Sequence, residues 1–119
     1  MGKYQQSGDH IMEVSEKDWK LFRSKIAPWQ EAYMDRLNRE YLDILTGDSK
    51  ASDKFWKIEE RINKDKKSRG VVIHMRRSSL YMDLAALLNE GVITFADIED
   101  FSDELKASLR YFCCRCDPI

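Results

Sequence analysis

The densest group of chemically active side chains is a basic block between Arg61 and Arg77, which contains seven Lys and Arg residues and one acid, Asp65. Cations gathered in so short a segment are typical of surfaces that contact phosphate groups. They are also typical of a solvated helix end and the loop after it. No aromatic residues interleave them to stack bases. The candidate basic patch comprises Lys64, Lys66, Lys67, Arg69, Arg76 and Arg77.

An acidic block follows the basic one. From Asp83 to Leu109 the chain has seven acids and one base, Lys106. The two blocks therefore carry about +6 and −6, although the net charge of the whole chain is −1. Such blocks either face each other within the fold, or one of them faces a partner. The overall charge by itself indicates no polyanionic partner.

Two segments contain possible metal ligands. Cys113, Cys114 and Cys116 lie close together near the C-terminus, but two of the thiols are adjacent and no histidine is near them. A structural zinc site takes four ligands from spaced pairs. The acidic run that begins at Asp97 lacks the glycine and the final glutamate of an EF-hand loop. We therefore predict no metal ligands and no cofactor.

Catalytic patterns are equally sparse. The sequence has no phosphate-cradling glycine loop, no nucleophile elbow and no metal-binding His-Glu pair. His74 follows an apolar run, but nothing in the sequence names a partner for general base catalysis. The segment 80–101 has the order of a helix-turn-helix, yet its second helix would bring Asp97 and Glu99 toward DNA phosphates. We predict no catalytic residues and a protein that is not an enzyme.

The elements that position these groups are mainly helical. Ser15 and Asp18 resemble a capping box, and apolar residues then recur every three or four positions, which predicts a long helix. Pro28 interrupts this stripe, but the stripe keeps its phase, which favours one kinked helix over two short ones. Gly47 is placed to end it. The stripe consists of Trp19, Phe22, Ile26, Trp29, Tyr33, Leu37, Tyr41 and Ile44.

Further helices are expected in the rest of the chain. Asp48, Ser49 and Ser52 are candidate N-caps of a second helix. Gly91 ends a third helix that contains Leu84. A last helix opens at Ser102. The stripe of the second helix is Ala51, Phe55, Ile58 and Ile62, with Trp56 beside it.

Two segments have an ambiguous pattern. Val71–Met75 and Val92–Phe95 are rich in β-branched residues and could pair as a two-stranded ribbon. The alternative is that the third helix already starts at Val72. Few glycines and prolines, five and two, argue against an all-β chain. The predicted fold class is all-α, a small bundle of four or five helices, with the short ribbon as an open addition.

A length of 119 residues corresponds to one domain. We expect a flexible N-terminal tail at 1–12, a helical domain at 13–112 and a cysteine-containing C-terminal tail at 113–119. The N-terminal residues lack the apolar segment of a secretory signal. No stretch approaches the ~20 apolar residues of a membrane helix. The prediction is a cytoplasmic protein without membrane contact.

Five short motifs run through the chain: Ser15–Lys20, Trp29–Glu31, Lys54–Trp56, Gly91–Phe95 and Phe101–Lys106. On these motifs the chain, from Glu13 to Phe112, resembles a group of small uncharacterised bacterial proteins. Members of that group are sometimes described as multidrug transporters. A mean hydropathy of −0.58 conflicts with that description. The resemblance implies no chemistry and no site residues.

The function that these patterns favour is a non-enzymatic protein-interaction or regulatory module, with another protein as partner. Trp and Tyr, which recur along the first stripe, are typical of interface anchors as well as of a core. The alternative is a sequence-independent nucleic-acid accessory protein that uses the basic block 61–77. Such binding is expected to be weak, because the acidic block lies close by in a small domain.

Overall fold

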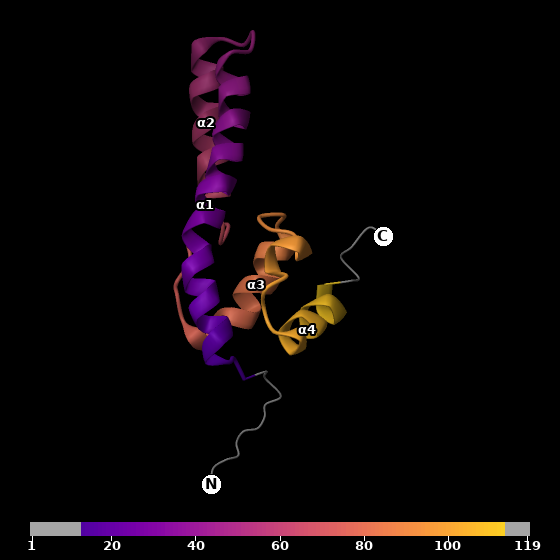
Figure 1. The fold of residues 1–119 in the computed structure, drawn as a ribbon. Helices are drawn as coiled ribbons and strands as arrows, with labels where there is room; N and C mark the ends of the chain where they lie inside the picture. The colour runs from indigo at the N-terminus through magenta and orange to yellow at the C-terminus, as the bar shows by residue number, and fades with distance from the viewer. Residues whose placement is uncertain (1–12, 114–119) are drawn as a thin grey trace.

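The computed structural model describes residues 13–113, which form four α-helices joined by connecting segments at 46–50, 66–79 and 90–102 (Figure 1). Short 3-10 turns, Arg77–Ser79 and Phe95–Ile98, precede the last two helices. No strand forms among the described residues, so the all-α prediction is confirmed and the ribbon is not present. The predicted tail 1–12 and residues 114–119 lie outside the described residues. The helices are α1 (Glu16–Leu45), α2 (Ala51–Asp65), α3 (Leu80–Asn89) and α4 (Asp103–Cys113).

Helix α1 is continuous over 30 residues and contains Pro28 in its interior. The phase of the apolar stripe therefore predicted correctly that one helix, and not two, spans the proline. The side chain of Ser15 caps the helix, because its Oγ accepts a hydrogen bond from the Asp18 backbone N–H at 3.1 Å. At the other end the helix stops at Leu45, two residues before Gly47.

The hydrophobic core lies where the first half of α1 meets α3 and α4, a region that we call the base. Phe22 from α1 and Leu84 from α3 are completely buried there. Trp19 and Trp29 are half-buried and pack against the same cluster. The stripe of α1 thus acts as core in this half of the helix. The core residues of the base are Phe22, Ile26, Leu80, Leu84, Leu87, Ile93, Ile98, Phe101, Leu105 and Leu109.

A buried carboxylate joins the two ends of the base. Asp18 does not complete the expected capping box; its side chain instead accepts hydrogen bonds from Ser102 N at 2.9 Å and from Ser102 Oγ at 2.6 Å. Ser102 Oγ in turn accepts from Leu105 N at the start of α4. The first turns of α1 and α4 are therefore tied together by one acid. Thr94 and Asp97, which have the spacing of a capping box, do form one at the start of the 3-10 turn Phe95–Ile98.

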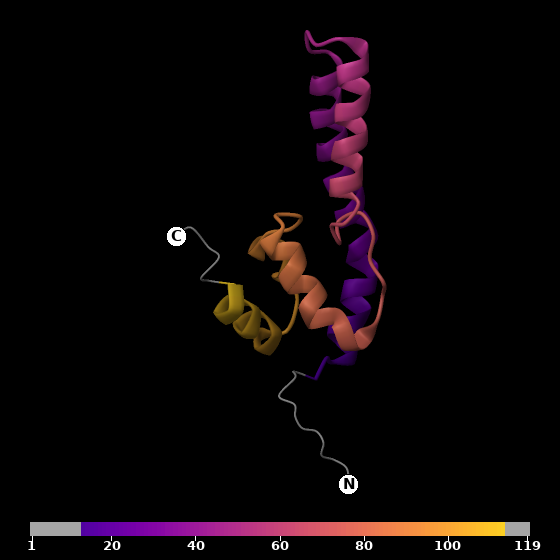
Figure 2. The same cartoon turned by 180° about the vertical axis from the view of Figure 1, so that it is seen from behind.

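The second half of α1 and the whole of α2 form an antiparallel hairpin, which we call the arm (residues 30–65). The arm projects beyond the base in both views (Figures 1 and 2). The Cα radius of gyration is 17.8 Å, whereas a globular domain of this length has about 13 Å. The elongated shape, 63 × 30 × 27 Å, leaves much of the arm without cover from the base.

The two β-branched segments lie close together but do not pair as strands. The N–H groups of Val71 and Val72 bond to Ser68 O, and those of Val92 and Ile93 bond to Leu87 O. These donors are therefore used in local turns and cannot form a ladder. The alternative start of the third helix at Val72 is also wrong, because α3 begins at Leu80.

The predicted N-caps of the second helix are wrong as well. Helix α2 begins at Ala51 and its N-cap is Lys50, which makes no side-chain capping bond. Asp48 and Ser49 instead lie in the turn after α1, and Ser52 is in the first turn of α2.

Leu84→Ala should lower the free energy of unfolding by about 2–5 kcal/mol, because it removes a fully buried side chain and leaves a cavity. Leu42→Ala is the matched control: its side chain is 57% exposed, so its effect should stay within about 0.5 kcal/mol. Urea denaturation followed by circular dichroism measures both. Equal effects of the two substitutions would mean that the core has been assigned to the wrong face.

Candidate functional site

The basic block gathers at a cleft between the end of α2 and the start of α3. The cleft has a volume of about 440 Å³, and we call it the basic cleft. Four of the six predicted patch residues line it, and His74 joins them. The lining residues are Lys66, Lys67, Arg69, Val72, Ile73, His74, Arg76, Ser79 and Asp83.

The structure separates the other two predicted residues from this group. Arg77 turns toward the start of α1, where its guanidinium donates to Glu16 Oε1 at 2.6 Å and to Val14 O at 2.8 Å. Lys64 lies on α2 and does not line the basic cleft. The predicted patch is thus one cluster of four cations, and not a continuous strip of six.

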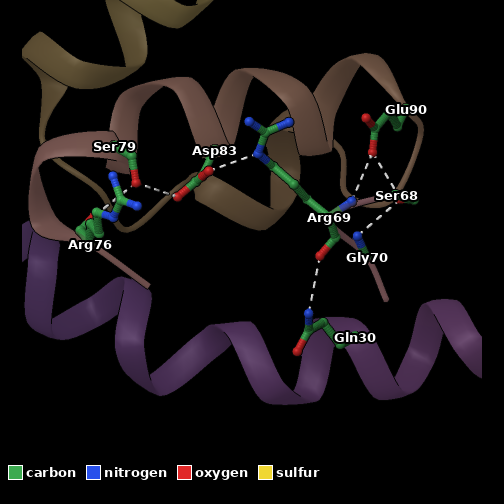
Figure 3. Close-up of polar contacts among 8 residues, drawn as sticks. All are labelled: Gln30, Ser68, Arg69, Gly70, Arg76, Ser79, Asp83 and Glu90. Atoms are coloured by element: carbon green, nitrogen blue, oxygen red, sulfur yellow. Dashed lines mark hydrogen bonds and ion pairs between the residues drawn. The ribbon is translucent and has the colours of Figure 1, made fainter. Parts of the chain in front are cut away.

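Arg69 fixes the loop that carries the cleft (Figure 3). Its Nε donates to Asp83 Oδ1 of α3 at 2.7 Å. Its carbonyl accepts from Gln30 Nε2 of α1 at 3.0 Å, and its backbone N–H donates to Glu90 Oε1 at 3.3 Å. One residue is therefore held by α1, by α3 and by the residue just after α3.

Ser68 adds a second anchor beside it. Its Oγ donates to Glu90 Oε1 at 2.8 Å and accepts from Gly70 N at 3.0 Å (Figure 3). At the far side of the cleft, Ser79 Oγ donates to Asp83 Oδ2 at 3.0 Å. The carboxylates Asp83 and Glu90 of the acidic block thus hold the basic loop in place. The two charge blocks face each other at these two positions.

Gly70 lets the loop approach α1 closely. A Cβ at this buried position would lie 2.8 Å from Val92 Cγ2 and 2.9 Å from Tyr33 Cε2. Both distances are shorter than side chains tolerate, so only glycine fits between α1 and the turn after α3. The sequence suggested only that Gly70 follows a charged helix end.

Four polar side chains of the cleft are free of partners within the described residues. Lys66, Lys67, His74 and Arg76 make no side-chain hydrogen bond or ion pair with any residue from 13 to 111. Arg69 remains 42% exposed although it pairs with Asp83. The cleft therefore presents cationic donors that the described part of the chain does not satisfy.

The arm contains a second candidate site, on the apolar stripe of α2. In this stripe Phe55 is 63% and Ile62 is 44% exposed. Within that stripe only Ile58 is half-buried. Trp56, in edge contact with Phe55, is also exposed. Helix α2 therefore shows its apolar side chains to solvent.

The interior of the arm is unusually polar. Asp65 is buried between the two helices and accepts hydrogen bonds from Tyr41 Oη at 2.6 Å and from Arg61 Nη2 at 3.3 Å. Arg61 also donates to Glu40 Oε1 at 2.5 Å. Burial, assisted by the hydrogen bond to Asp65, raises the pKa of Tyr41 to about 12. These bonds, with buried Leu37, hold α1 and α2 together.

Helical periodicity places four of the exposed apolar residues on one side of the arm. Each residue turns an α-helix by about 100°. On this count Leu42 and Leu45 point to the same side of the antiparallel hairpin as Phe55 and Ile62. Arg36 points to the opposite side of α1, where it donates to Gly91 O at 2.7 Å. The side with the four apolar residues, which we call the apolar face, is therefore turned away from α3.

Carboxylates lie beside the apolar face. By the same count Glu31 and Asp35 border it along α1, and Glu59 borders it along α2. Asp35 pairs with Arg39, and Glu59 accepts a hydrogen bond from Asn63 Nδ2 at 2.6 Å. The apolar face thus has acidic groups along both edges.

Comparisons with protein families, curated proteins and solved structures give no match to this chain. In the described part of the chain no helix is both long and apolar enough to cross a membrane. Of the predicted cysteine cluster only the backbone of Cys113 is described, within α4. The function must therefore be inferred from the basic cleft and the apolar face.

Gly70→Ala should destabilise the protein by about 1–3 kcal/mol, because the added methyl group must displace Tyr33 or Val92. Gly47→Ala is the control: its Cβ would meet only backbone oxygens at 3.4 and 3.6 Å, which is ordinary contact. Urea denaturation midpoints report both. If Gly70→Ala were as stable as Gly47→Ala, the close approach of the loop to α1 would be wrong.

The raised pKa of Tyr41 predicts a loss of stability at high pH. An unfolded tyrosine releases its proton near pH 10, whereas folded Tyr41 retains it up to about pH 12. The stabilising contribution is complete below pH 10 and disappears as the pH rises through this interval. The free energy of unfolding should therefore fall more steeply from pH 10 to 12 in the wild type than in Tyr41→Phe. Parallel curves for the two proteins would contradict the buried hydrogen bond to Asp65.

Proposed function

We propose that this protein is a non-enzymatic protein-interaction module that binds its partner through the apolar face of the arm. The observation that carries the proposal is the exposure of Leu42, Leu45, Phe55 and Ile62 on one side of a hairpin whose interior is polar. Contiguous exposed apolar groups with a polar rim are typical of protein interaction sites. Phe55 and the neighbouring Trp56 are of the residue types enriched in interface cores.

The rim favours a basic amphipathic helix as the partner. Glu31 on one edge and Glu59 on the other would meet Lys or Arg residues that flank an apolar stripe, whereas Asp35 already pairs with Arg39. A helix laid along the apolar face, across α1 and α2, would bring apolar residues at every third or fourth position onto this face. A single basic amphipathic helix would therefore match both the apolar face and its acidic edges.

A second copy of the chain is a poorer fit. Its own Glu31, Asp35 and Glu59 would face the same carboxylates and repel them. The area is also small: α2 has 15 residues, so the face is roughly 22 Å long and two helices wide, and an interface would bury on the order of 800 Å² in total. That is below the roughly 1,200 Å² of stable interfaces. The size supports a transient contact with another protein, as a regulatory module requires.

Site-directed photo-crosslinking tests the proposal. A photoreactive amino acid at position 55 should form a covalent adduct with the partner protein in cells of the organism from which the protein comes. The same group at position 57, on the charged side of α2, should not. The adduct peptide, identified by mass spectrometry, should come from a basic amphipathic helix. Charge reversal by Glu31→Lys with Glu59→Lys should reduce the adduct at position 55, because it removes the complementary rim.

Three outcomes would overturn this function. Equal adduct yields at positions 55 and 57 would show that the apolar face has no specific role. An adduct with a second copy of the chain would replace the partner with a homodimer. An adduct that is unaffected by charge reversal would reject the basic helix.

A further inference from the structure

The basic cleft holds an excess of positive charge. Lys66, Lys67, Arg69 and Arg76 are cationic at neutral pH, and Asp83 is the one acid among the residues that line it. The charge of Asp83 is already balanced by Arg69 at 2.7 Å. Like charges gathered in a cleft repel one another and concentrate counter-ions there. The cleft is therefore set up to attract an anion.

The donors suit phosphate oxygens. Arg69 uses its Nε on Asp83, which leaves the terminal nitrogens of a 42% exposed side chain available. Among the described residues Arg76 is bonded only through its carbonyl, to Ser79, which leaves its whole guanidinium for a ligand. Guanidinium groups bind phosphate oxygens in pairs. Lys66 and Lys67 add two point charges at the same cleft.

The cleft is also prepared in shape. Gln30, Asp83 and Glu90 hold its loop from three directions (Figure 3), so little ordering is needed when a ligand binds. Its volume of about 440 Å³ lies in the range of small-molecule sites, roughly 300–1,000 Å³. Val72 and Ile73 supply an apolar wall beside the cations.

We propose that the basic cleft binds a small phosphorylated molecule of the size of a nucleoside diphosphate. Arg69 and Arg76 bind the phosphate oxygens, Lys66 and Lys67 neutralise the remaining charge, and the organic part lies against Val72 and Ile73. This site is separate from the apolar face, so it does not depend on the function proposed above.

A nucleic-acid strand is less well matched. Backbone binding needs cations spread along a track to contact successive phosphates. Here Arg77 is tied to Glu16 and Val14, and Lys64 does not line the cleft. The cations that remain form one cluster beside an apolar wall, which fits one compact anion.

Isothermal titration calorimetry of the full chain tests the site with four probes: adenosine diphosphate, inorganic pyrophosphate, adenosine and a short single-stranded oligonucleotide. Adenosine diphosphate should bind with one saturable site, pyrophosphate more weakly, and adenosine not at all. Lys67→Gln with Arg76→Gln should weaken the binding of adenosine diphosphate at least roughly tenfold, because charged donors are lost. These side chains have no partner among the described residues, so the variant should keep its fold, which circular dichroism checks.

The control variant, Lys20→Gln with Lys57→Gln, removes two exposed cations outside the cleft and should bind like the wild type. Phe55→Ser should also bind normally, which separates this site from the apolar face. Absence of saturable binding of both phosphate probes would overturn the proposal, as would an equal loss in the control variant. Binding of the oligonucleotide more tightly than adenosine diphosphate would assign the cleft to nucleic acid instead.

Discussion

The anchoring of Arg69 determines how the chain returns from the arm to the base. The segment between α2 and α3 has little regular structure, so few backbone bonds define its path. Contacts of Arg69 with Gln30, Asp83 and Glu90 supply that definition from α1, from α3 and from the turn after α3. They set where α2 ends against α1 and where α3 begins. They also use two acids of the acidic block, which leaves the remaining cations of the loop open to solvent.

The arm reverses the usual distribution of polar and apolar groups. Tyr41, Arg61 and Asp65 form hydrogen bonds in its interior, whereas Phe55 and Ile62 face solvent. Buried polar groups are tolerated because each finds a partner; among the described residues Arg61 Nε is the exception. The arm does not need its apolar face for internal packing, and that face is available for another molecule. Since α1 continues into the base through Phe22, the arm is held in a defined direction.

The opposed charge blocks have a more limited role than their sizes suggest. Asp83 pairs with the guanidinium of Arg69, whereas Glu90 holds the loop through the Ser68 hydroxyl and the Arg69 backbone N–H. Asp97 completes a capping box at Thr94, and Asp103 opens α4, so these acids serve helix starts. Surface charges separated by more than about 10 Å are largely screened. The acidic block therefore balances only the part of the basic block that it touches.

The sequence alone determined the elements that depend on local patterns. The stripe from Trp19 to Ile44 predicted one helix through Pro28, because the period of an α-helix is visible over several turns. The end of α3 near Gly91, with φ of 74°, was readable from the residue type, because glycine adopts a positive φ without steric strain. The helix that contains Leu84 was also predicted, and the Leu84 side chain is completely buried.

Only the tertiary structure decided which faces are covered and which charges meet. The apolar residues of α2 recur with the period of a helix that packs on a core. This period does not show whether another element covers them, and in the arm Phe55 is exposed. Asp18 binds Ser102, which is 84 positions away, and Arg69 binds Asp83 across 14. Such pairs arise from the packing of separate helices. Since packing depends on the whole chain at once, no local pattern could place the basic cleft or the apolar face.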